Sequence, residues 1–337
     1  MLPLAATLSC SRVLTEEQED SPIAFTSAVT VKAPVETAGD LDGTSGFAVW
    51  ATHQGGEPAA LTDLLMDGVQ VYRSGNEWAY DRVRMWQEGQ WHFEAFYPYP
   101  ETLAPEAGQT GRDVLSTGLH FSKDGSQSAA PEGVYIDYYY SPAASHDLMT
   151  ASADRSYPSG GSGAVEFTFE HLLARVSIAV QTGASGLTVQ SLEFSGMSIL
   201  GAYNHTDAYA GRWQTLTSAS LPPSFPASEP LTGTFRADLT GVTFPLTPND
   251  PVTLIPDLLL IPQTPGNAAA GESPAILTVT YRIGQGDWET RSADIPSTAA
   301  WESGHHYRYT LTLGTADVGL EVEVANWTVE DYTVEYI

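Results

Sequence analysis

The chain has little cysteine, little positive charge and no long apolar run in its body. Cys10 is the only cysteine among 337 residues, so neither an intrachain disulfide nor a cysteine-based zinc site can form. The 14 Lys and Arg residues face 41 Asp and Glu residues, and the net charge of −27 repels phosphate backbones. We therefore expect no nucleic-acid partner. After the first nine residues, no run approaches the roughly 20 apolar residues that cross a bilayer as a helix.

A helical pattern is also missing, because no window longer than about three turns carries an apolar stripe with a period of 3.6 residues. Instead, 30 Gly and 22 Pro separate short runs that are rich in Val, Thr, Tyr, Phe and Trp. This composition predicts an all-β protein. A chain of 337 residues is too long for one small core and suits two domains of roughly 150 residues each.

The stretch 163–180 organises the prediction for the rest of the chain. Its apolar residues stand at odd positions from Val165 to Phe169 and at even positions from Val176 to Val180. The inward face must therefore change within 171–174, where we expect a bulge or a tight corner. The Gly/Ser/Pro stretch 156–163 indicates a linker just upstream. A new core is thus expected to begin near the middle of the chain.

Short runs with period-two alternation are predicted as strands. In the first half these are 23–31, 46–52, 67–72, 77–80, 91–97, 119–121 and 134–140. In the second half, after the two runs of 163–180, they are 187–194, 199–203, 212–215, 243–246, 252–260, 275–283, 301–313 and 320–327. Strands at this spacing are typical of a β-sandwich. The predicted division is a signal remnant, lipidated cysteine and acidic tether over 1–22, an N-terminal β-sandwich over 23–160, and a C-terminal β-sandwich over 161–337 that includes a candidate donor strand at 331–337.

The N-terminus indicates an exported protein. Residues 1–9 are small and apolar and are followed by Cys10, as at a bacterial lipoprotein processing site where the cysteine becomes lipidated. Thr7 departs from that pattern, because Leu is usual there. A diacylglycerol-type anchor with two or three chains would hold the protein stably on a membrane. The acidic segment 11–20 has the composition of a disordered tether.

Six motifs in a fixed order resemble the fimbrillin-like proteins of the major and minor fimbria type in Bacteroidetes. They are IAFTS at 23–27, GFAVWA at 46–51, GNEWAYD at 75–81, MWQEGQWHFEAFYPY at 85–99, HDLMTASA at 146–153 and VEFTFEHLLARVSIAV at 165–180. The pattern W-x-x-G-x-x-Y-x-Y at 301–309 and the run 320–327 resemble the family's last strands. The resemblance implies two tandem transthyretin-like Greek-key sandwiches, a surface-exposed outer-membrane lipoprotein, a place in a fimbrium, and no cofactor.

The resemblance also implies assembly by strand donation, in which a first strand is removed and a strand of another subunit replaces it. Ile23 and Phe25 would belong to the strand that is removed. The C-terminal run 331–337 alternates and is a candidate donor. Its candidate contact residues are Tyr332, Val334 and Tyr336. The same run is equally expected as a closing edge strand of its own domain.

One departure from the family bears on processing. Stalk fimbrillins are cut by an arginine-specific protease after the first strand, yet this chain has no arginine from Val13 to Tyr72 and only Lys32 as a basic residue there. Cleavage after Arg12 would remove the lipid and leave the first strand. We therefore expect either an uncleaved anchor or tip subunit, or a different protease.

No residue pattern predicts an enzyme. His305 and His306 lie next to each other in a predicted strand, so they point to opposite faces and do not chelate one metal together. His146 and Asp147 are interpreted as a turn or helix-cap pair. The sequence lacks G-x-S-x-G, H-E-x-x-H and P-loop motifs. The sequons at Asn204 and Asn326 are interpreted as chance matches, and no metal or cofactor site is predicted.

A surface lipoprotein that binds glycans without polymerising is the alternative, with a host protein or glycan as its partner. Exposed aromatic side chains would be its evidence, since such rings are amphipathic and often mark binding surfaces. The dense aromatic clusters are Trp86, Trp91, Tyr97, Tyr99 and Tyr138 to Tyr140. Aromatic strands more often belong to a core, but three successive tyrosines must place at least one ring on the outer face.

Overall fold

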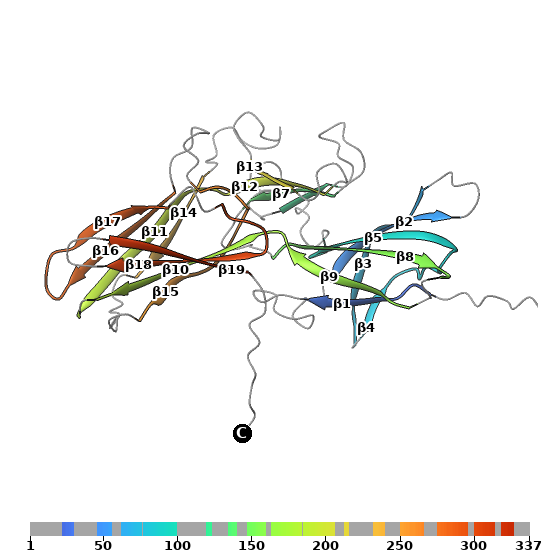
Figure 1. Ribbon diagram of the computed structural model, residues 1–337, viewed down its shortest axis with the longest axis horizontal. Helices are drawn as coiled ribbons and strands as arrows, with labels where there is room; N and C mark the ends of the chain where they lie inside the picture. The colour runs from blue at the N-terminus through green and yellow to red at the C-terminus, as the bar shows by residue number, and fades with distance from the viewer. Residues whose placement is uncertain are drawn as a thin grey trace, which may run out of the picture.

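The structure is a computed structural model, and it describes a set of segments that run from near the N-terminus to residue 326. These are residues 22–29, 46–55, 62–75, 77–99, 119–122, 134–139, 147–159, 163–183, 185–205, 212–215, 232–239, 250–265, 275–295, 300–313 and 318–326. Every regular element in them is a β-strand (Figure 1). The all-β prediction is therefore confirmed.

A seven-stranded sheet forms the lobe at the right of Figure 1, in the order β1-β9-β8-β5-β2-β3-β4. Its strands are β1 (Phe25–Val29), β2 (Phe47–Gly55), β3 (Thr62–Ser74), β4 (Glu77–Tyr80), β5 (Gly89–Tyr97), β8 (Met149–Tyr157) and β9 (Val165–His171). All neighbours are antiparallel except β1, which runs parallel to β9. Strand β1 is therefore an edge strand, and its pairing with β9 is the one parallel pairing in this sheet.

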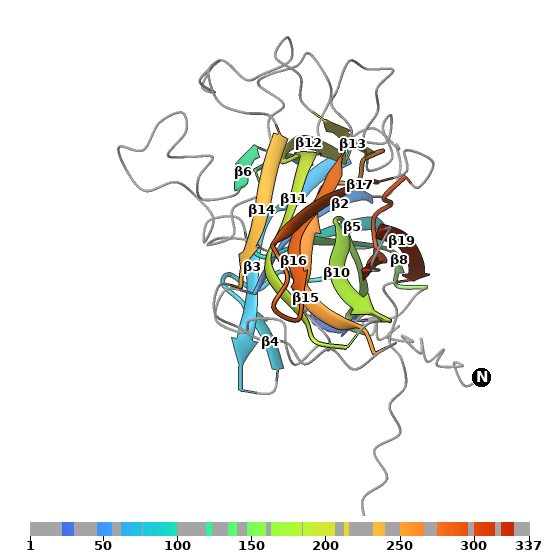
Figure 2. The same cartoon turned by 90° about the vertical axis from the view of Figure 1, so that its left-hand side faces the viewer.

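Two four-stranded sheets form the lobe at the left of Figure 1, in the orders β15-β10-β18-β19 and β14-β11-β16-β17. Their strands are β10 (Ala174–Thr182), β11 (Leu187–Ser198), β14 (Thr232–Asp238), β15 (Val252–Leu260), β16 (Ile276–Ile283), β17 (Glu289–Asp294), β18 (His305–Leu313) and β19 (Val318–Asn326). In the end-on view of Figure 2, β14 and β11 of one sheet lie to the left of β10 and β19 of the other. Their inward side chains share one cluster, which is the arrangement of a β-sandwich.

A fourth sheet joins the two halves of the sequence. Its order is β13-β12-β7-β6, with β6 (Leu119–Ser122), β7 (Val134–Tyr139), β12 (Leu200–His205) and β13 (Arg212–Thr215). The central pair is β7 with β12, antiparallel, with Val134 opposite His205. Strands predicted for the N-terminal sandwich are thus hydrogen-bonded to strands of the second half.

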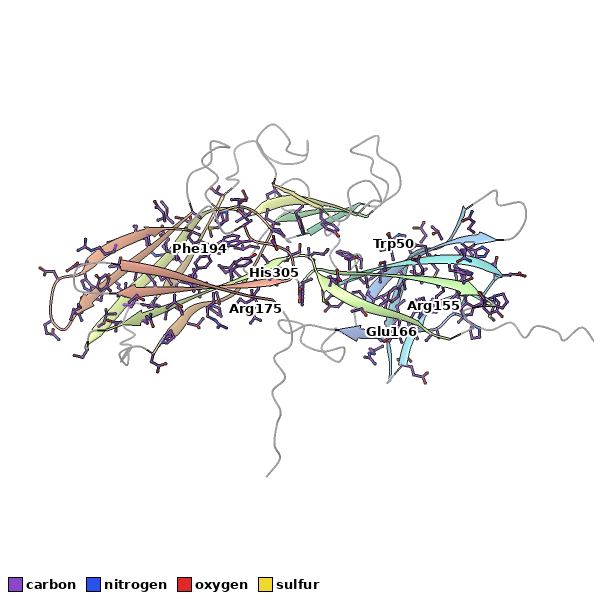
Figure 3. All side chains as sticks on the ribbon, viewed as in Figure 1. Trp50, Arg155, Glu166, Arg175, Phe194 and His305 are labelled. Carbon is purple, nitrogen blue, oxygen red and sulfur yellow. The ribbon has the colours of Figure 1, made fainter. Side chains whose placement is uncertain are left out.

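The buried side chains form two hydrophobic clusters. We call the first core N, and it consists of Ile23, Phe25, Phe47, Val49, Ala51, Met66, Val71, Tyr80, Trp86, Trp91, Phe93, Ala95, Tyr97, Met149, Ala151, Val165, Phe167 and Phe169. The second, core C, is built mainly from β10, β11, β15, β16 and β18, and it includes Phe194. Core C also takes Trp50 from β2, although Figure 3 shows Trp50 and Phe194 in different lobes. The lobes are therefore joined by apolar packing.

The predicted corner within 171–174 is confirmed. Strand β9 ends at His171 with its odd residues buried, and β10 begins at Ala174 with Val176, Ile178 and Val180 buried. The prediction that a new core begins with this stretch is wrong for its first strand, because the inward residues of β9 belong to core N. Packing changes from core N to core C at the corner, and not at residue 160. The division into two folding domains stays a prediction.

Three strands, β8, β14 and β17, were not predicted from the sequence. The predicted linker at 156–163 is wrong at its start, because β8 continues to Tyr157. The predicted strand 243–246, the lipidation candidate Cys10 and the candidate donor 331–337 lie outside the described residues.

Candidate strand-exchange site

Strand β1 lies at the edge of the seven-stranded sheet with β9 as its neighbour. The register places Phe25 opposite Val165 and Val29 opposite Phe169. The amide of Val165 also donates a 2.7 Å hydrogen bond to the carbonyl of Ala24, just before the strand begins. Strand β1 is therefore held by the hydrogen bonds of one β-ladder, whereas a central strand is held by two ladders, one on each side.

Phe25 of β1 and Ile23, two residues before the strand, belong to core N. Phe25 is 4% exposed, and its ring stacks on Phe167 at 5.8 Å between centroids. The same ring meets Tyr80 and Phe93 edge-on, at 5.4 Å and 6.2 Å. Ile23 is 2% exposed. We call the place that these two side chains fill the β1 seat.

A second set of contacts fixes the beginning of β1. The segment 81–88, here called the strap, joins β4 to β5 and runs past Ile23. The amide of Ile23 donates to the carbonyl of Arg84 at 2.8 Å, and Pro22 forms an isolated antiparallel bridge with Met85. The hydroxyl of Tyr80 donates to the carbonyl of Ile23 at 2.9 Å and accepts from the amide of Arg84 at 3.1 Å. Burial raises the pKa of Tyr80, so the phenol stays protonated and able to donate.

Removal of β1 would uncover both kinds of surface that an incoming strand needs. The edge of β9 would present unpaired N–H and C=O groups, and the rings of Tyr80, Phe93 and Phe167 would face water. Burying one aromatic side chain there is worth about 1.5–3 kcal/mol relative to leaving it exposed. The uncovered surface would match a strand that offers large apolar side chains two residues apart.

Of the predicted exchange residues, the structure brings Ile23 and Phe25 together in one core. Tyr332, Val334 and Tyr336 lie outside the described residues, as does the lipidation candidate Cys10. The contribution of Tyr80 and Arg84 was not predicted. The sequence signal for Tyr80 was its place as the second-last residue of the GNEWAYD motif, directly before the strap.

A buried polar pair lies at the corner between the two cores. The Nδ1 atom of His171 lies 2.7 Å from Oδ1 of Asp147, and the two side chains are 0% and 2% exposed. Asp147 thus contacts a histidine 24 residues away, so the interpretation of His146 and Asp147 as a turn or cap pair is wrong for Asp147. His146 is not among the described residues.

His305 and His306 do have different partners, as their alternation in β18 predicts. His306 Nε2 lies 2.9 Å from the hydroxyl of Ser177, and His305 Nδ1 lies 2.9 Å from the carbonyl of Ser303. Within the described segments, no group of three or more His, Cys, Asp or Glu side chains is placed to hold a metal ion.

The aromatic clusters proposed as a glycan platform are largely core residues. Trp86, Trp91 and Tyr97 are 5%, 2% and 7% exposed, and the two indole rings meet edge-on at 5.4 Å. Tyr99 is partly buried against core C. Tyr138 and Tyr139 end β7 next to β12, and their side chains, like residue 140, are outside the description. The described aromatic strands therefore support the core interpretation.

No helix capable of crossing a membrane occurs in the part of the chain that the structure describes.

Comparison with known proteins places the fold among fimbrial proteins. The profile of a family described as fimbrillin-like matches residues 34–327. A fimbrial protein from Bacteroides vulgatus has a similar structure, with a TM-score of 0.63, 17% identity, and coverage of 92% of this chain and 100% of its own. A candidate cell adhesion protein from Bacteroides ovatus gives a TM-score of 0.52 with 18% identity over 93% of this chain and 99% of its own. Curated protein sequences gave no match.

Proposed function

Since the chain belongs to the fimbrillin-like family, a family of structural and non-enzymatic subunits, we propose that it is a subunit of a cell-surface fimbria that assembles by strand donation between subunits, with the β1 seat as the acceptor. The observation that carries this proposal is the construction of the β1 seat. An edge strand with a single β-ladder covers a cluster of aromatic rings, so its removal opens a groove that only another strand fills well.

Strand donation fits this seat in physical terms. The backbone of the incoming strand would satisfy the edge of β9, and side chains two residues apart would replace Ile23 and Phe25. The run 331–337 has such an alternation, with Tyr332, Val334 and Tyr336 as its candidate contact residues. We propose it as the donor that fills the seat of a neighbouring copy.

We further propose that the subunit reaches the outer membrane as a lipoprotein modified at Cys10. Because no arginine stands between Val13 and Tyr72, an arginine-specific protease cannot release β1 by cutting between β1 and β2. Two arrangements agree with this sequence. Either a different protease removes β1, so that copies of the subunit link by strand donation, or the subunit is an anchor or tip that keeps its lipid and its own β1 and ends the polymer.

Mass spectrometry of the N-terminus, on protein taken from the native cell surface, tests these proposals together with gel analysis of its assemblies. A lipid-modified Cys10 in detergent-resistant multimers would identify an anchored subunit. A start between β1 and β2 would identify a stalk subunit with an open seat and would overturn the anchor proposal. Protein that is monomeric in every surface preparation would contradict the fimbrial function itself.

A second experiment tests the seat directly. A protease site inserted after Lys32 in the full chain allows β1 to be cut from the folded protein. After cleavage, a synthetic peptide of residues 22–31 should compete with multimer formation, because it carries Ile23 and Phe25. The same peptide with Phe25→Asp is the matched control and should not compete. Equal competition by both peptides would show that the seat does not recognise the strand.

A further inference from the structure

Large apolar side chains are exposed in two places among the described residues. Val83 and Met85 in the strap are 56% and 45% exposed, and Trp288, directly before β17, is 42% exposed. The other large apolar side chains whose burial is described are buried or half-buried. Exposed apolar side chains mark a contact surface when they lie next to one another, as Val83 and Met85 do in the strap.

The two places lie toward opposite ends of the elongated molecule. The strap joins β4 to β5 in the right-hand lobe of Figure 1, whereas the turn between β16 and β17 lies at the left-hand tip. One molecule cannot bring these places together, but two copies arranged head to tail can. A contact of that kind is heterologous, and it repeats from copy to copy along a filament.

Trp288 is held in place by its surroundings. The turn before it is tied to the neighbouring β10–β11 turn, since the amide of Gly284 donates to the carbonyl of Gly186 at 3.0 Å. The guanidinium of Arg282 lies 4.6 Å from the centroid of the indole ring. A ring that is already ordered loses little conformational entropy when a partner covers it.

The strap offers a surface of matching chemistry. Met85 has a flexible, polarisable thioether, which packs favourably against aromatic rings. Exposed Arg82 stands beside the apolar pair, and exposed Asp287 stands beside Trp288. Copies that each carry a net charge of −27 repel one another, so a local pair of opposite charges favours this one approach over others.

We propose that Trp288 of one copy packs on Val83 and Met85 of the next copy, with Arg82 facing Asp287. The proposal rests on the fimbrial function above and adds a second junction between subunits linked by strand donation. Three side chains bury far less than the roughly 1,000 Å² of a stable interface, so this junction is weak by itself. In a polymer the linked neighbour is always close, and a weak contact then forms readily.

Disulfide trapping tests the contact in the full chain with β1 in its seat. In a Cys10→Ser background, Gln87→Cys marks the strap and Gln285→Cys marks the β16–β17 turn, without altering the contact residues. Mixed in equal amounts and oxidised, these two variants should give mainly mixed dimers, well above the statistical share of one half. Adding Trp288→Ala to the Gln285→Cys variant should abolish the excess. In the control, Glu166→Cys replaces Gln87→Cys and places the cysteine on the exposed side of β9 (Figure 3). Mixed with Gln285→Cys, it should give only the statistical share of mixed dimers.

A statistical share of mixed dimers, unchanged by Trp288→Ala, would overturn the contact. Because the assay needs no strand exchange, that result would leave the fimbrial function standing if native multimers still form. Conversely, native surface preparations without multimers would contradict the fimbrial function, whatever the trapping shows.

Discussion

The hydroxyl of Tyr80 donates a 2.9 Å hydrogen bond to the carbonyl of Ile23, across 57 positions of the chain. Tyr80 is the last residue of β4, and Ile23 lies two residues before β1, so the bond joins one edge strand of the seven-stranded sheet to the start of the other. The sheet therefore curls until its edges meet, and its inward face becomes core N. The strand proposed for exchange is the one that closes this curl.

Replacing the phenol should loosen β1 without removing its apolar contacts. In Tyr80→Phe the carbonyl of Ile23 and the amide of Arg84 lose their shared partner, at a cost of about 1–2 kcal/mol. Amide exchange at Val165, whose hydrogen bond to Ala24 reports the seating of β1, should become roughly tenfold faster. Tyr72→Phe removes an exposed bond to Asp81 and is the control with no expected change. Equal amide exchange at Val165 in both variants would show that the hydroxyl of Tyr80 does not hold β1 in place.

Shortening the aromatic side chain of β1 should have a larger effect. Phe25→Ala leaves a cavity between Tyr80, Phe93 and Phe167 and should cost about 3–5 kcal/mol. Urea unfolding of the right-hand lobe, followed by tryptophan fluorescence, should show a lower midpoint. Ala24→Ser, on the exposed side, should change the free energy of unfolding by less than about 0.5 kcal/mol.

Phe25→Leu keeps most of the volume and separates cavity formation from misfolding. Its midpoint should fall between those of the wild type and Phe25→Ala. A midpoint for Phe25→Ala equal to that of Ala24→Ser would mean that β1 contributes little to core N.

Alternation in the sequence predicted β9 and β10 and located the corner between them. Strand β9 alternates strictly between buried and exposed residues, and the change of parity before β10 located the corner at 171–174. Strand β17, ETRSAD, has no buried residue, and β8 buries only Met149 and Ala151, so neither carries a signal of period two. Strands of this kind are recognised only through their neighbours.

Pairings between segments that lie far apart in the chain could not be predicted from the sequence. Nothing local indicates that β7 pairs with β12, or that the strap meets Ile23, because register between remote strands depends on the assembled core. The pair of His171 and Asp147 did have a signal. Position 171 continues the odd, inward series of β9, and a buried imidazole requires a polar partner.

This buried pair should contribute far more to stability than an exposed pair of the same geometry. His171 and Asp147 lie 2.7 Å apart at the corner, with side chains 0% and 2% exposed. Asp147→Ala leaves the imidazole without this carboxylate and should lower the free energy of unfolding by about 3 kcal/mol. Asp154→Ala breaks the 2.7 Å contact with His92 at side-chain exposures of 85% and 45%, and should cost less than about 1 kcal/mol.

Thermal unfolding of the two variants, read side by side, measures this contrast. Equal melting temperatures would show that the corner pair does not fix the junction of the cores.

The imidazole of His92 should titrate at an unusually high pH. Glu94 and then Asp154 raise the pKa of His92 from 6.5 to about 9, against a smaller opposing effect of burial. Glu94 has the larger effect although its oxygen lies at 3.4 Å and that of Asp154 at 2.7 Å. The carboxylate of Glu94 is 24% exposed and that of Asp154 is 85% exposed, so water screens Glu94 less.

The raised pKa fixes the direction of the pH dependence. The folded protein binds the proton more tightly than the unfolded chain, so the stabilisation is complete below pH 6.5 and is lost as pH rises to about 9. Half-exposure of His92 limits it to under about 1 kcal/mol. An NMR titration of the His92 ring should give a midpoint that Glu94→Gln lowers more than Asp154→Asn does. A wild-type midpoint near 6.5 would show that neither carboxylate holds the proton.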